Sequence, residues 1–116
     1  MSDTFGLYEA WQRDQRLAKQ AVSEASERCA EYARAEAAYY AAKAATAMAL
    51  KADGEPVTYI QTIVKGHPDV NPKLFEYTLA EGKYRAAHKA IDVYRDAMNQ
   101  SFQEYKRSMS EIGDYR

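Results

Sequence analysis

Two pairs of acidic side chains have a spacing that could serve metal binding or acid–base chemistry. Asp92 and Asp96 are four residues apart, as are Glu27 and Glu31, so each pair would lie on one face of a helix. Metal sites in helical bundles combine such carboxylates with Glu-x-x-His spacing, and neither histidine of this chain completes that motif. We therefore expect solvated charged faces, and no metal site.

Other catalytic patterns give no stronger signal. No Ser-His-Asp or Cys-His arrangement can be assembled from the sequence, and no glycine-rich phosphate loop occurs. The one cysteine, Cys29, cannot form an intrachain disulfide, and its helical surroundings predict a small buried apolar side chain. The sequence predicts a protein that is not an enzyme, with no catalytic residue and no cofactor.

A locally basic stretch offers the alternative of nucleic-acid contact. Lys83, Arg85 and Lys89 fall close together in the second half of the chain. Acidic residues such as Glu81 and Asp92 interleave them, which is typical of an ordinary solvated helix. Nucleic-acid binding is therefore the second hypothesis.

Aromatic residues are the strongest binding signal. The chain has ten tyrosines and one tryptophan, residue types that dominate protein-binding hot spots. Tyr39 is followed directly by a second tyrosine, Tyr40, and two adjacent residues of a helix cannot both face one partner helix. We take Tyr8, Trp11, Tyr39 and Tyr59 as the candidate partner-binding residues.

The elements that position these residues are predicted by apolar spacing. An unbroken seven-residue repeat predicts one long helix over about 72–112, packed against another helix. The repeat consists of Tyr77, Tyr84, Ile91, Met98, Tyr105 and Ile112.

A first long helix is predicted over about 4–51, where no proline occurs. Between Ala30 and Ala52, 12 of 23 residues are alanine, the best helix former. We expect this alanine-rich face to pack on the large side chains of the other helix. Its apolar stripe is Leu7, Trp11, Ala18, Val22, Ala25, Cys29, Ala33, Ala37, Tyr40, Ala44 and Met48.

The connection contains helix stop and start signals. Gly54 suits the left-handed position after the first helix, and Pro56 can begin a short helix over about 56–65. Phe75 and Leu79 lie off the heptad positions and are expected to cover that short helix. The predicted fold is all-α, one domain over 1–116: two long antiparallel helices in a coiled-coil-like hairpin with a short helix in the connection.

Composition restricts the class of partner. The formal net charge is −1, so no global field attracts nucleic acid or an anionic membrane. The N-terminus lacks the regions of a signal peptide, and charges interrupt every stretch long enough to span a bilayer. We expect a cytoplasmic protein that does not contact membranes.

The chain resembles small helical-hairpin proteins encoded in phage and prophage early or recombination regions. The resemblance is carried by the Ala, Glu, Lys and Tyr alternation of 30–43, by the break at 54–66 and by the run 80–87, and it ends near 106–108. It implies an accessory factor and transfers no catalytic residue.

The predicted function is non-enzymatic protein binding, by an accessory or inhibitor protein that lays a helix face on a partner. An anti-defence protein such as a CRISPR inhibitor belongs to this class. One hairpin leaves apolar surface exposed, so a homo-oligomer is expected, and the first helix could instead reach a second chain in a swapped dimer. The alternatives are a nucleic-acid-associated recombination or replication accessory using Lys83, Arg85 and Lys89, and a structural oligomeric scaffold.

Overall fold

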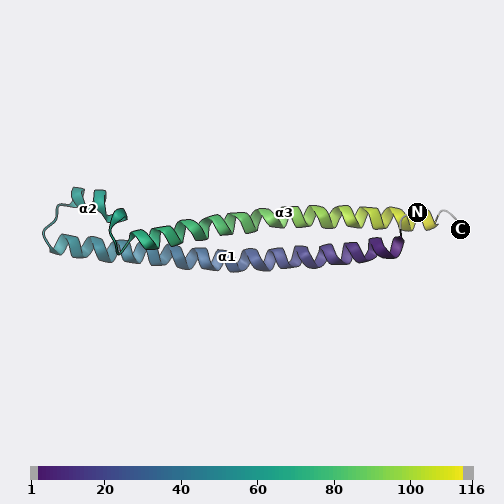
Figure 1. Ribbon diagram of the computed structural model, residues 1–116, viewed down its shortest axis with the longest axis horizontal. Helices are drawn as coiled ribbons and strands as arrows, with labels where there is room; N and C mark the ends of the chain where they lie inside the picture. The colour runs from purple at the N-terminus through teal and green to yellow at the C-terminus, as the bar shows by residue number, and fades with distance from the viewer. Residues whose placement is uncertain (1–2, 114–116) are drawn as a thin grey trace. The chain divides into compact units, whose positions relative to one another are not determined.

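The structure, a computed structural model, describes residues 3–113 and contains helices but no strand in that range (Figure 1). Helix α1 spans Thr4–Ala52, α2 spans Val57–Ile63, a 3-10 turn η1 follows at Val64–Gly66, and α3 spans Asn71–Gly113. The expected all-α fold, two long antiparallel helices with a short helix in the connection, is confirmed.

The chain divides into two compact units. Unit 1 consists of the described residues of Met1–Ser26 and Ala86–Arg116, and unit 2 consists of Glu27–Arg85. Each unit therefore contains a segment of α1 and a segment of α3, and unit 2 also contains α2.

In unit 1 the start of α1 lies along the end of α3 (Figure 1). The heptad positions Ile91, Met98 and Tyr105 of α3 are half-buried there, as predicted, whereas the last predicted position, Ile112, is exposed. Polar pairs interrupt this apolar contact. The Ser101 hydroxyl donates a hydrogen bond to the buried Asp14 carboxylate. A polar pair inside a helix interface favours one register, because any slip would leave the buried carboxylate without its donor.

Unit 2 has the larger apolar core, where α2 and η1 pack on the two long helices. Tyr39, Ile60, Val64 and Val70 are buried together, and Val70 is completely buried. Partly buried side chains surround them: Ala47, Leu50, Leu74 and Tyr77. The short helix thus supplies apolar surface that a simple hairpin would lack.

The packed face of α1 differs from the predicted stripe. Up to Ala25 the two agree except at Val22, which is exposed, and the structure then continues through Arg28 where the prediction took Cys29. The half-buried or buried residues repeat every seven positions as Thr4, Trp11, Ala18, Ala25, Tyr32, Tyr39 and Thr46. The predicted stripe from Cys29 onward is exposed, so the expectation of a buried cysteine is wrong.

This shift in the residues of α1 that face α3 also contradicts the expectation that the alanine-rich face packs on the other helix. Of the 12 alanines between Ala30 and Ala52, most are exposed, and tyrosines fill the contact with α3. Large side chains bury more apolar area than alanine does, so the phase that buries Tyr32 and Tyr39 is the more stable one.

The connection follows the predicted signals with one exception. Gly54 has φ +88° and its N–H donates to the Lys51 carbonyl at 3.0 Å, which ends α1 as expected. Pro56 is the extended residue before α2. Phe75 and Leu79 are exposed on α3, so the prediction that they cover the short helix is wrong.

Candidate protein-binding surface

An aromatic cluster fixes the first turns of α1 in unit 1. The Trp11 ring stacks on Tyr105 at a centroid distance of 5.6 Å and an interplanar angle of 15°, and lies 4.9 Å from Phe102. Tyr8 completes the cluster, 5.5 Å from Tyr105 and 6.2 Å from Trp11. Four rings from two helices therefore hold this part of α1 in a defined orientation.

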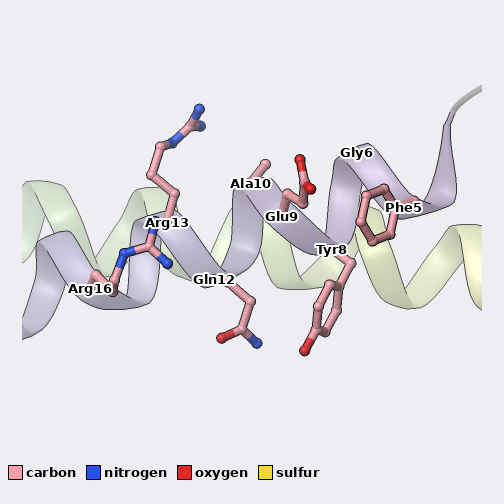
Figure 2. A pocket seen from close by; sticks show the side chains of 8 residues that line it. All are labelled: Phe5, Gly6, Tyr8, Glu9, Ala10, Gln12, Arg13 and Arg16. Carbon is pink, nitrogen blue, oxygen red and sulfur yellow. The ribbon is translucent and has the colours of Figure 1, made fainter.

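Beside this cluster a groove of about 520 Å³ runs along α1. Phe5 and Tyr8 give it apolar surface, with 67% and 41% of each residue exposed. In Figure 2 the side chains of Tyr8 and Gln12 project to the same side of α1, and Arg13 projects to the opposite side. We call the lining residues the N-terminal face: Phe5, Gly6, Tyr8, Glu9, Ala10, Gln12, Arg13 and Arg16.

The chain before α1 helps to set the position of Phe5. The Asp3 carboxylate accepts a hydrogen bond from the Phe5 N–H at 3.1 Å, which satisfies one donor at the helix start. A Cβ on Gly6 would lie 2.9 Å from the same carboxylate. Glycine therefore leaves room for the Asp3 cap beside the exposed ring.

Unit 2 contains a second set of rings, which is mainly internal. Tyr84, Tyr32, Tyr77 and Tyr39 stack in turn from alternate helices, with centroid distances of 5.7, 5.6 and 5.5 Å. The Tyr77 hydroxyl donates a hydrogen bond to Glu36 at 3.3 Å. A hydrogen bond with Tyr32 is the largest cause that raises the Tyr77 pKa, and desolvation and the nearby Glu36 charge add to it.

The four predicted contact residues have different environments. Tyr8 is exposed on the N-terminal face, and Tyr59 is exposed on α2. Trp11 is half-buried and serves the aromatic cluster. Tyr39 is only 3% exposed and belongs to the core of unit 2, so its ring is unavailable to a partner in this conformation. Phe5, the most exposed ring of the N-terminal face, was not among the predicted residues.

The three basic candidates do not form one stripe along α3. Lys83 and Arg85 are two residues apart, which places them roughly 200° apart around the helix. Arg85 also bonds Glu81 at 2.5 Å, which neutralises its charge locally. Lys83 and Arg85 belong to unit 2, and Lys89 belongs to unit 1.

One member of each acidic pair forms an ion pair along its own helix. Asp92 contacts Arg95 at 2.5 Å and Glu31 contacts Arg28 at 3.0 Å. Among residues 3–113 no three His, Cys, Asp or Glu side chains come together in a way that could hold a metal ion. In the same part of the chain, no helix has the length and apolar character needed to cross a membrane.

Comparison of the chain with protein-family models, with curated proteins and with solved structures gives no significant match.

Proposed function

We propose that this protein is a non-enzymatic accessory or inhibitor protein that binds another protein through the N-terminal face of unit 1. The observation that carries the proposal is the exposed pair Phe5 and Tyr8 on a helix that the aromatic cluster already holds in place. A pre-organised aromatic pair loses little conformational freedom when a partner covers it.

The chemistry of the face specifies the kind of partner. Arg13 and Arg16 line the same groove as the two rings, Arg13 from the side of α1 opposite to Tyr8, and arginine with tyrosine is the usual composition of a protein hot spot. Arg13 also contacts Asp14 at 3.5 Å, so its stem is oriented before binding. A partner that presents an apolar surface edged by carboxylates fits this face best. The resemblance to phage and prophage hairpin proteins adds a phage-encoded inhibitor, including an anti-defence protein, to the proposal.

Site-specific photocrosslinking tests the proposal with a matched control. A benzophenone amino acid replaces Phe5 in one variant and Phe75 in another, two phenylalanines with 67% and 68% exposure in different units. In the cells that normally contain this chain, we expect one discrete protein adduct from position 5 and none from position 75. Adding Tyr8→Ala and Arg16→Ala should remove the adduct. Equal labelling from both positions would contradict the proposal.

The same experiment separates the two competing functions. A nucleic-acid adduct that disappears on Lys83→Ala and Lys89→Ala would favour the recombination or replication accessory, whose affinity should fall steeply with salt. An adduct only with other copies of this chain would favour a structural scaffold.

A further inference from the structure

A second surface lies on α1 in unit 2. Ala33, Ala37, Tyr40 and Ala44 are all exposed there, and Tyr40 retains 53% exposure. Their steps of four, three and four residues match the apolar positions of an antiparallel or parallel coiled coil, so they face one direction. We call these four residues the outer face. A large ring between small residues gives this face a shape with both a projection and hollows.

Two opposite charges border the outer face on the same flank. Glu36 and Lys43 are seven residues apart, two turns of one helix, and therefore occupy equivalent positions. Contacts within unit 2 orient both side chains. Glu36 accepts the hydrogen bond from Tyr77 at 3.3 Å, and Lys43 Nζ lies 5.9 Å from the centre of the Tyr39 ring.

We propose that the outer face binds a second copy of this chain, with the two α1 helices antiparallel around a two-fold axis. In this register Tyr40 of each copy packs on Ala37 of the other, and Ala33 lies opposite Ala44. Each ring then fills the space above an alanine, which is the large-on-small packing that leaves no void between helices.

Charge complementarity selects the antiparallel direction. When two helices pack antiparallel, equivalent flanks face each other, so Glu36 of each copy meets Lys43 of the other. The two-fold axis makes this contact twice. In a parallel pair, the flank with Glu36 and Lys43 would face the other flank of the second copy, where Ala41 lies. Tyr40 would then lie opposite Tyr40 of the second copy instead of an alanine. Only the antiparallel pair therefore uses both charges.

The solvent-exposed area of the chain is large enough to include such an interface. A folded monomer of 13.2 kDa is expected to expose roughly 6,400 Å², and this chain exposes 8463 Å². The excess of about 2,000 Å² per chain is as large as the total area that a standard interface removes from both partners. The residues of the outer face all lie in unit 2, and the inference does not depend on the function proposed for the N-terminal face.

Charge reversal tests the register by sedimentation equilibrium of the full chain over a range of concentrations. We expect a reversible dimer whose dissociation constant rises about tenfold in Glu36→Lys, because two attractive contacts become repulsive. The double variant E36K/K43E should restore the dimer, although it restores neither intramolecular contact of these side chains. Arg34→Glu, an exposed charge reversal on the other flank, is the control and should change nothing. Circular dichroism checks that each variant remains helical.

Disulfide trapping tests the direction independently. In a Cys29→Ala background, the double variant A33C/A44C should form a covalent dimer on mild oxidation, and A33C alone should not. Cysteine pairs bridge only when their Cα atoms are within about 7 Å, which the antiparallel register gives for 33 and 44. A monomer up to about 1 mM, an E36K/K43E variant as weak as E36K, or trapping by A33C alone would each overturn the proposal. Adduct formation at Phe5 is a separate readout, so failure of the dimer leaves the proposed function standing.

Discussion

Tyr39 is 3% exposed and Tyr40 is 53% exposed, although the centroids of their rings lie only 5.0 Å apart. One residue of an α-helix turns the side-chain direction by roughly 100°, and this turn carries the second ring out of the core. The two tyrosines therefore share local sequence and helix, and both rings lie near Tyr77, at centroid distances of 5.5 Å for Tyr39 and 6.3 Å for Tyr40. Only Tyr39 is buried in the core of unit 2.

Tyr39→Ala should lower the free energy of unfolding by about 3 kcal/mol, because it removes a buried ring from the core. Tyr40→Ala should lower it by only about 1 kcal/mol in dilute protein, since Tyr40 is half exposed and loses only its ring contacts with Tyr39 and Tyr77. Urea unfolding followed by circular dichroism measures both values. Similar losses for the two variants would mean that Tyr40 also supports the folded chain.

Asp14 and Ser101 should be energetically coupled. Asp14→Ala should cost about 2 kcal/mol, because it leaves the Ser101 hydroxyl half-buried without its acceptor. Adding Ser101→Ala should cost little more, giving a coupling energy of about 1 kcal/mol in a double-mutant cycle. Strictly additive effects would show that the two side chains do not interact in solution.

Two glycine-to-alanine changes should have opposite signs. Gly82 lies inside α3 with open space around its missing Cβ, so Gly82→Ala should stabilise by about 0.5–1 kcal/mol. Gly54 also has open space but adopts φ +88°, so Gly54→Ala should destabilise by about 1 kcal/mol. Thermal unfolding of both variants reports the difference, and two shifts of equal sign would contradict it.

The raised Tyr77 pKa should make stability fall in alkaline solution. The stabilisation from the neutral Tyr77 phenol is fully present below the ordinary tyrosine pKa of 10.0. It is lost as the pH rises above that pKa, because Tyr77 ionises in the unfolded chain before it ionises in the folded chain. Urea unfolding at pH 8 and at pH 11 should show a smaller loss in Tyr77→Phe than in the wild type. Tyr59→Phe, on the exposed surface of α2, is the control and should behave as the wild type.

The sequence predicted α3 better than α1, for a physical reason. In α3 the heptad positions are large residues such as Tyr77 and Ile91, and no competing apolar stripe exists. After Ala25 of α1, both the three-residue step to Arg28 and the four-residue step to Cys29 satisfy helical periodicity. The prediction chose Cys29 because it is more apolar than Arg28. In the structure α1 instead buries the face that contains Tyr32 and Tyr39. Because 12 of the 23 residues from Ala30 to Ala52 are alanine, apolar residues occur in both phases and the two are hard to distinguish.

The candidate surface was predicted only in part. Tyr8 was selected for its residue type, and its exposure agrees with a binding role that remains a prediction. Phe5 was not predicted, because a single phenylalanine at the start of the predicted helix 4–51 has no spacing pattern that distinguishes a contact residue. The burial of Tyr39 depends on α2 and Val70, long-range contacts that no local pattern in α1 contains.

The uneven distribution of aromatic residues gives each unit its own optical signal. Trp11, the one tryptophan, stacks on Tyr105 in unit 1, whereas Tyr32, Tyr39 and Tyr77 stack in unit 2. Tryptophan emission should therefore report the melting of unit 1, and tyrosine absorbance should be weighted toward unit 2. If the two curves coincide, the continuous helices make the chain unfold as a single cooperative element; if they separate, each unit opens with its own midpoint.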